Sequence, residues 1–246
     1  MKLCVIGGAG ARSAFLTKSL VKSTRDIRVD HIVLLDNDQQ KLKTYGEISR
    51  ELSRRLDPDL TFEVTSDARA ALTGVDYIIT TIRAGGDAGR LFDEQTCLAH
   101  GVLGQETTGA GGFAMAIRSV PTLVYYCTLA REVANPGHLI FNFTNPSGII
   151  TQALRSKGFD NVYGICDAPS GFIKQLEEIL EIPYGTLDIE CYGLNHLSWF
   201  RNAKVNGRDV QRELLDNPRT YEHSEMRLFT REMARISGDC MLNEYL

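Results

Sequence analysis

The sequence lacks a surplus of positive charge, a long apolar run and paired cysteines, and each absence excludes a class of function. Its 27 Lys and Arg are opposed by 31 Asp and Glu, so the net charge of −4 favours neither nucleic acid nor anionic membranes as partners. We find no apolar run of the ~18–20 residues that a membrane span needs. Met1 and Lys2 lead directly into an apolar strand, which is not the pattern of a signal sequence.

The six cysteines are dispersed and none forms a CxxC pair. Without a signal sequence, this usage is typical of a reducing compartment, and we expect a cytoplasmic protein with free thiols. The hydrophobic content of 43% suffices for a sizeable core. We find no internal repeats and no low-complexity linker.

Short apolar strands alternate with helical segments through the first two thirds of the chain. Strands are expected at 2–6, 32–35, 60–64, 76–81, 138–143 and 161–165, and helices at 12–22, 38–55, 67–72, 112–133 and 146–156. This alternation predicts an α/β fold, a Rossmann-like, doubly wound, mostly parallel sheet, over residues 1–168. After Pro169 it weakens, and a helix at 172–180 with strands at 187–192 and 197–205 predicts that 169–246 begins a second, α+β domain.

The first expected strand ends in the glycine-rich turn Gly7-Gly8-Ala9-Gly10-Ala11-Arg12-Ser13. Gly8 is expected to permit the tight turn, Gly10 to let a pyrophosphate approach the helix N-terminus, and Ser13 to pack where the pattern has a third glycine. Asp36 closes the second strand, where a carboxylate accepts hydrogen bonds from a ribose 2′-hydroxyl and repels a 2′-phosphate.

This combination predicts an NAD-binding unit. The alternative for this turn is a doubly wound domain with another ligand at its switch point. Asp38 is a competing acid, but we expect it to begin the following helix.

Polar clusters follow several later strands, at the sheet edge where doubly wound folds bind ligands. They are Arg83 with Arg90, GQETTGAGG from Gly104, NFTNPSG from Asn142, GICD from Gly164 and GLNH from Gly193. Together these segments resemble glycoside hydrolase family 4, the NAD- and divalent-metal-dependent glycosidases, and within it the branch that hydrolyses 6-phospho-β-glucosides. The resemblance runs from Met1 to Leu246.

The resemblance implies a role for each matching residue. Cys166 and His196 match the ligands of a Mn²⁺-like ion, with open positions left for water and substrate. Asn145 matches a residue that contacts the sugar hydroxyls near the metal. Arg90 matches a substrate-binding arginine and Arg83 lies on the same loop, where a guanidinium suits a phosphate group.

Three further positions are implied as catalytic. Tyr245 matches the base, although Cys240 lies five residues before it and the family spacing is C-x-Y-L. Glu106 matches an acidic residue that raises the basicity of this tyrosine. Asp167 stands where the phospho-α-glucosidase branch has a general acid and the phospho-β branch usually has asparagine.

The implied reaction is redox elimination, in which NAD⁺ takes a hydride from the sugar C3, the C2 proton is abstracted, and the hydride returns after hydrolysis. Three alternatives stay open: a phospho-α-glucosidase or α-galactosidase of the same family, a lactate/malate-type NAD-dependent dehydrogenase, and a non-catalytic NAD-binding module. The substrate is expected to be a phosphorylated disaccharide, and the full-length protein a homo-oligomer.

Members of the family continue well beyond the position of Leu246. We therefore expect a C-terminally truncated chain with an incomplete second domain. Such a chain is expected to bind NAD but to hydrolyse poorly.

Overall fold

The computed structural model describes residues 1–224, 226 and 229–244 of the chain. The chain divides into two compact units, Met1–Ile165 and Cys166–Leu246. Each unit has its own hydrophobic core.

The first unit is built on a six-stranded sheet in the order β3-β2-β1-β4-β5-β6, and every neighbouring pair is parallel. Its strands are β1 (Lys2–Ile6), β2 (His31–Leu35), β3 (Thr61–Thr65), β4 (Tyr77–Thr80), β5 (Leu139–Asn142) and β6 (Val162–Gly164). This topology confirms the predicted Rossmann-like α/β fold. Because all six strands are parallel, their carboxyl ends meet at one edge of the sheet.

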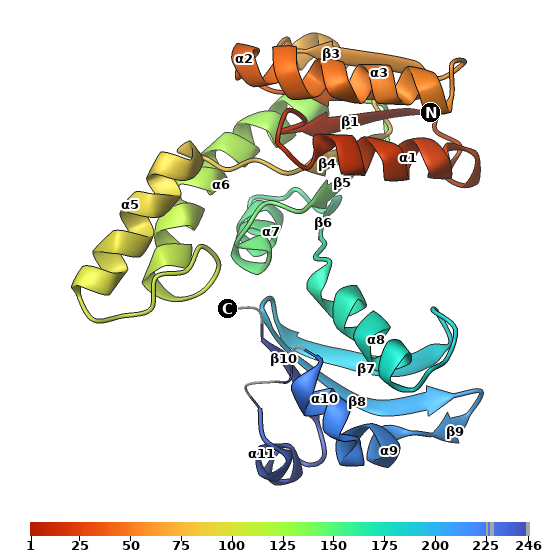
Figure 1. Ribbon diagram of the computed structural model, residues 1–246. Coiled ribbons are helices and arrows are strands. Elements are labelled where there is room, and N and C mark those ends of the chain that lie inside the picture. The colour runs from red at the N-terminus through yellow and green to blue at the C-terminus, as the bar shows by residue number, and fades with distance from the viewer. Residues whose placement is uncertain (225, 227–228, 245–246) are drawn as a thin grey trace. The chain divides into compact units, whose positions relative to one another are not determined.

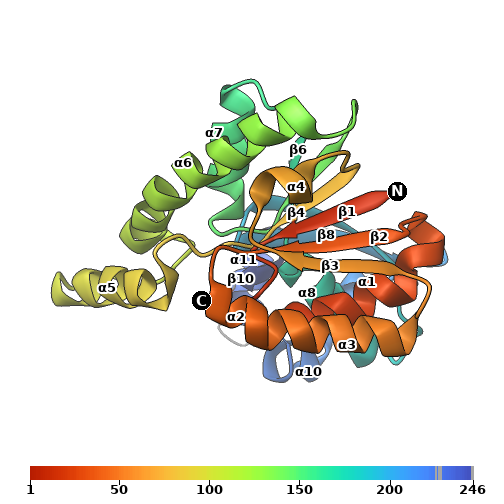
Figure 2. The ribbon, with the colours of Figure 1, turned by 90° about the horizontal axis from the view of Figure 1, so that it is seen from above.

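Helices cover both faces of this sheet (Figures 1 and 2). They are α1 (Ser13–Ile27), α2 (Gln39–Lys41) and α3 (Glu47–Leu56) on one face, and α4 (Ala68–Leu72), α6 (Gly109–Val133) and α7 (Ser147–Ser156) on the other. Alternate residues of β1 point into separate cores, with Leu3 and Val5 on the α1 side and Cys4 and Ile6 on the α6 side. A strand buried on both faces explains the continuous apolar run in the sequence.

Two helical segments differ from the sequence prediction. The expected helix at 38–55 contains a π-helical turn, Leu42–Gly46, where a Cβ on Gly46 would lie 2.5 Å from Val64 Cγ1, so the chain needs glycine to approach β3. The helix α5 (Gly86–Ala99) was not predicted and pairs with α6.

By length and composition alone, α6 could cross a membrane, a test that the core helix of a globular domain also passes. Arg118 and Pro121 interrupt its apolar sequence. Leu123, Cys127 and Ala130 lie in the core beneath the sheet, which assigns this end of α6 to the domain interior.

The second unit packs α8 (Ala168–Ile179) on an antiparallel sheet ordered β10-β8-β7. The expected strands are present as β7 (Leu187–Leu194) and β8 (Leu197–Val205), whereas β9 (Arg208–Asp209), α9 (Gln211–Asp216), α10 (Pro218–Glu222), α11 (Arg231–Ile236) and β10 (Met241–Glu244) were not predicted. The rings of Phe172 on α8 and Phe200 on β8 pack in its core at 4.9 Å between centroids, tilted by 59° to each other.

Candidate functional site

The glycine-rich turn joins β1 to α1 at the carboxyl edge of the sheet. Gly7 has a φ of +86°, and a Cβ there would lie 2.5 Å from the Thr81 carbonyl oxygen. At Gly8 a Cβ would lie 2.8 Å from the Leu34 Cβ, so Gly8 allows close approach to β2. The left-handed residue of the turn is therefore Gly7, which the sequence analysis did not single out, while Gly8, expected to permit the tight turn, is a second position where a Cβ would meet its neighbours.

Gly10 differs from both, because a Cβ at this position would meet no atom within 4 Å. Its carbonyl accepts a hydrogen bond from the Ser13 N–H at 3.0 Å, and the small, buried Ser13 begins α1. The space beside Gly10 at a helix N-terminus is suited to an anionic group such as a pyrophosphate.

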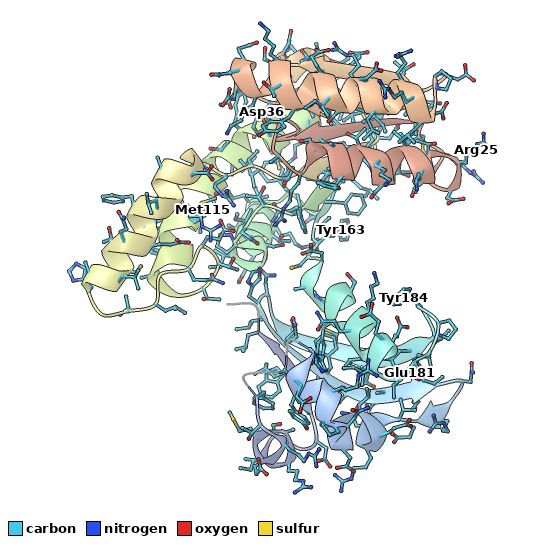
Figure 3. The ribbon with its side chains drawn as sticks, in the orientation of Figure 1. Arg25, Asp36, Met115, Tyr163, Glu181 and Tyr184 are labelled. Atoms are coloured by element: carbon cyan, nitrogen blue, oxygen red, sulfur yellow. The ribbon has the colours of Figure 1, made fainter. Side chains whose placement is uncertain are left out.

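Asp36 follows β2 with a half-buried carboxylate that the backbone holds in place (Figure 3). Its Oδ2 accepts the Ala9 N–H at 3.1 Å and its Oδ1 accepts the Asp38 N–H at 3.0 Å. Each oxygen retains acceptor capacity for a ligand hydroxyl. Asp38 itself caps α2 by accepting from the Gln40 and Lys41 N–H groups, which confirms the expectation that it begins the helix.

The predicted substrate residues Arg83 and Arg90 lie together around Glu106. Arg83 Nε is 3.3 Å and Arg90 Nη1 is 3.5 Å from the Glu106 carboxylate. Each arginine has a second partner, since Arg83 pairs with Asp87 at 2.6 Å and Arg90 with Glu94 at 2.7 Å. With three carboxylates against two guanidiniums, an anionic ligand must compete with these carboxylates for the arginine N–H groups.

A buried ion pair fixes the loop that carries Arg83. Arg118 on α6 makes a bidentate ion pair with Asp93 on α5, and Asp93 is only 7% exposed. Arg118 Nε also donates to the Ala84 carbonyl at 3.1 Å, and its Nη2 lies 3.7 Å from the sulfur of Met115, which is labelled in Figure 3. Arg118 thus ties the two helices to the loop after β4.

Asn142, at the end of β5, organises the loop that presents Asn145. The fully buried Asn142 Oδ1 accepts from Thr80 Oγ1 at 2.8 Å and from the Thr144 N–H at 3.2 Å. Its Nδ2 donates to Thr151 Oγ1 at 3.2 Å. These bonds join β4, β5 and α7, so they hold the start of the loop that carries Asn145 in place at the sheet edge.

In the second unit, Cys166 and His196 are brought together although 30 positions separate them in the sequence. Cys166 precedes α8, and the buried His196 lies in the β7–β8 turn with a φ of +65°. A hydrogen bond from the His196 side chain is the main cause that holds the pKa of the Cys166 thiol below its ordinary value. A thiolate beside an imidazole is a donor pair for a transition-metal ion.

Cys166 is half-buried, whereas His196 is only 7% exposed. Asp167 is exposed at the start of α8, where its side chain makes no capping hydrogen bond. In the part of the chain that the structure describes, no three His, Cys, Asp and Glu side chains form a closed metal cluster. Tyr245, the expected base, lies outside the described residues.

Residues 2–182 match the family described as family 4 glycosyl hydrolase, which is well over half of the sequence. The chain belongs to this family. The family 4 chain is also similar to individual enzymes, and it spans about half the length of the curated relatives that it matches.

Two relatives illustrate the range of named activities among the proteins that this family 4 chain resembles. It is 35% identical over 219 residues to the 6-phospho-beta-glucosidase BglT of Thermotoga maritima, covering 88% of this chain and 51% of the relative. It is 32% identical over 225 residues to the phospho-alpha-glucosidase PagL of Clostridium acetobutylicum, covering 88% and 50%.

A solved structure matches nearly the whole chain. The 6-phospho-beta glucosidase from Thermotoga maritima, determined with manganese, NAD⁺ and glucose-6-phosphate, superposes with a TM-score of 0.88 at 31% identity, over 99% of this chain and 57% of the other.

Sequence reasoning missed Arg118 and Asp93, which hold the site loops of this family 4 chain, and it placed Asn142 in a motif without assigning it a role. The sequence could have pointed to Arg118, because it is the only charged residue between Gly109 and Ala130. A charge in an apolar helix needs a partner, but the sequence does not name Asp93 as that partner.

Proposed function

We propose that this chain carries the cofactor, metal and substrate residues of a glycosidase that hydrolyses 6-phospho-β-glucosides by an NAD- and metal-dependent redox elimination. The Cys166–His196 pair carries the proposal, because a lactate/malate-type dehydrogenase needs no thiolate–imidazole pair. Membership of family 4 supports it.

The residues of the first unit suit NAD. Gly10 leaves room for the pyrophosphate, α1 presents its N-terminal N–H groups, and Asp36 accepts hydrogen bonds from the ribose hydroxyls. The same carboxylate repels a 2′-phosphate, which favours NAD over NADP.

Cys166 and His196 suit a Mn²⁺-like ion, since a thiol with a lowered pKa and an imidazole leave further positions open. When bound, NAD supplies a reversible hydride acceptor and the metal stabilises negative charge that develops on the sugar oxygens. The chain's own part is to hold both groups and the sugar, and to move protons.

We assign the sugar to Asn145, Arg83 and Arg90, and its phosphate to the guanidinium N–H groups of the two arginines, for which the phosphate competes with Glu106. Tyr245 abstracts the C2 proton, Glu106 raises the basicity of this tyrosine, and Asp167 assists departure of the aglycone. The relative from Thermotoga maritima, solved with glucose-6-phosphate, supports a phosphorylated sugar as the substrate.

One observation favours a second candidate, a phospho-α-glucosidase. Asp167 follows Cys166, is exposed and makes no capping hydrogen bond, so its carboxyl is available to donate a proton as a general acid. The similarity to the phospho-alpha-glucosidase of Clostridium acetobutylicum is consistent with this candidate.

A panel of phosphorylated and free α- and β-glycosides, each assayed with and without Mn²⁺ and NAD⁺, separates these functions. We expect turnover of the 6-phospho-β-glucoside that needs both additions. Preference for the α-anomer supports the second candidate, and turnover of the free glycosides alone contradicts both.

The protein is proposed to act in the cytoplasm, in keeping with six cysteines that form no disulfide. It is also proposed to function as a homo-oligomer.

A further inference from the structure

Arg12 occupies a position that helix formation disfavours. It is the N-cap residue of α1, where its side chain makes no capping hydrogen bond, and the first turn of α1 contains no acidic residue. A helix N-terminus carries partial positive charge, so a cation there is unfavourable, and Ser, Thr, Asp or Asn is preferred. Four other helices follow this preference, since α2, α4, α10 and α11 are capped by Asp38, Asp67, Asn217 and Thr230. The helix itself therefore gives no reason for an arginine at position 12.

The positive charge at this end of α1 is not balanced by a neighbouring protein group. Arg12 is exposed, and among the described residues no carboxylate forms an ion pair with its guanidinium. The backbone N–H groups of Ala14 and Phe15, in the first turn, likewise have no acceptor in the part of the chain that the structure describes. A guanidinium adds a planar fork of N–H donors to these two groups. The start of α1 thus offers both positive charge and hydrogen-bond donors to a ligand.

The same turn holds the open space beside Gly10, two residues before Arg12. The Ser13 N–H donates to the Gly10 carbonyl at 3.0 Å, which closes the turn around Arg12. At the start of this turn, the Ala9 N–H donates to Asp36 Oδ2 at 3.1 Å. An acid, an open space and a cation therefore follow one another along the turn, and a dinucleotide has its ribose hydroxyls and its diphosphate in the matching order.

We propose that Arg12 binds the diphosphate of the dinucleotide, an inference that rests on the proposed NAD site. Its guanidinium donates to the diphosphate oxygens, and two parallel N–H donors suit two oxygens of one phosphate group. The N–H groups of Ala14 and Phe15 donate to the same anion from the helix. Arg12 thereby favours ligands that carry the diphosphate over a nucleoside alone. A residue that breaks the capping preference without a structural gain is typical of a functional site.

Calorimetric titration of the 246-residue chain with NAD⁺, ADP and adenosine tests the proposal. We expect Arg12→Ala to raise the dissociation constants of NAD⁺ and ADP at least tenfold, and to leave that of adenosine unchanged because adenosine has no phosphate. Added NaCl should weaken NAD⁺ binding less steeply in Arg12→Ala than in the unaltered chain, since one charge pair is gone. Arg25→Ala is the matched control, because Arg25 lies in the last turn of the same helix, at the far end from Asp36 (Figure 3).

Denaturant unfolding of the ligand-free variant Arg12→Ser separates binding from folding. A serine can cap the helix and removes the cation, so we expect an unfolding midpoint at least as high as that of the unaltered chain, together with the same loss of NAD⁺ affinity. A lower midpoint would show that the arginine serves the fold, and it would overturn the proposal.

Two binding results would also overturn it. One is equal NAD⁺ affinity in Arg12→Ala and the unaltered chain. The other is a loss of NAD⁺ affinity without a loss of ADP affinity, which would place the guanidinium away from the diphosphate. Failure of the unaltered chain to bind NAD⁺ would overturn the proposed cofactor site as well, whereas every other outcome leaves that site in place.

Discussion

At the scale of single residues, the glycine-rich turn contains one glycine that folding needs and one that binding needs. A Cβ on Gly7 would collide with the backbone at Thr81, and the positive φ strains any other residue. A Cβ on Gly10 would enter open space, the space assigned to the cofactor.

Gly7→Ala is expected to lower the free energy of unfolding by at least about 2 kcal/mol, because strain and a backbone clash add. Gly10→Ala is expected to leave stability unchanged and to weaken NAD⁺ binding at least tenfold. Denaturant unfolding and calorimetric titration with NAD⁺ measure the two effects. Equal NAD⁺ affinity in Gly10→Ala and the unaltered chain would contradict the assignment of this turn.

Cys166→Ser is expected to abolish tight metal binding, since a serine hydroxyl does not ionise at neutral pH and is a poor replacement for a thiolate. Titration with Co²⁺, followed by its sulfur-to-metal absorption band, measures this loss directly. Cys191→Ser is the control, because partial burial raises the pKa of the Cys191 thiol, which disfavours the thiolate that a metal ion needs. An unchanged Co²⁺ absorption band in Cys166→Ser would contradict the assignment of Cys166 as a metal ligand.

Asp76 provides a pH dependence of stability. The hydrogen bond from Asn135 Nδ2, at 2.8 Å, is the main cause that lowers the pKa of its carboxyl, and the Lys2 N–H adds to it. A carboxyl whose pKa is lower in the folded state stabilises fully above its unfolded pKa of ~3.9, and this stabilisation is lost as the pH falls through the folded pKa.

Asp76→Asn should therefore lower the free energy of unfolding by about 1 kcal/mol or more at neutral pH and by less at acidic pH. Unfolding curves at several pH values measure the difference. A penalty that stays constant as the pH falls would contradict this account.

Several residues could be found from the sequence for a physical reason. Gly10, Asp36 and Asp38 lie within a local strand–turn–helix–strand unit, where spacing alone determines their neighbours. Cys166 and His196 come together only in the fold, and a resemblance to a family was needed to pair them. Asn142 and Asp93 act through buried hydrogen bonds between distant segments, which no local pattern reveals.

At the scale of elements, the hairpin of α5 and α6 depends on one ion pair. Arg118→Ala is expected to leave the buried Asp93 carboxylate unpaired, at a cost of about 3–5 kcal/mol. Hydrogen exchange should show α5 losing protection while β1 and β4 keep theirs. Arg212→Ala is the control, because its ion pairs are exposed. Protection of α5 that survives in Arg118→Ala would show that apolar packing alone holds the hairpin.

The elements differed in how far their sequence predicted them. The parallel strands β1, β2, β4 and β5 are apolar on both faces and were found at nearly their observed bounds. The helix α5 escaped prediction because it begins with two glycines of positive φ and exposes apolar residues, so its pattern is neither capped nor amphipathic.

At the scale of the whole molecule, a nucleotide fold and a thiolate–imidazole pair occur in one chain. In a dehydrogenase the cofactor leaves with electrons, whereas the proposed hydrolysis returns them to the sugar. The two accounts therefore differ in the fate of NADH rather than in the fold.

The central claim is tested most directly by following aglycone and NADH in the same reaction, with p-nitrophenyl 6-phospho-β-glucoside, NAD⁺ and Mn²⁺ supplied to the chain. The account predicts release of p-nitrophenol, however slow, that stops when Mn²⁺ or NAD⁺ is withheld and that leaves no accumulated NADH. Stoichiometric NADH formed from a 2-hydroxy acid, with the glycoside untouched, would contradict it.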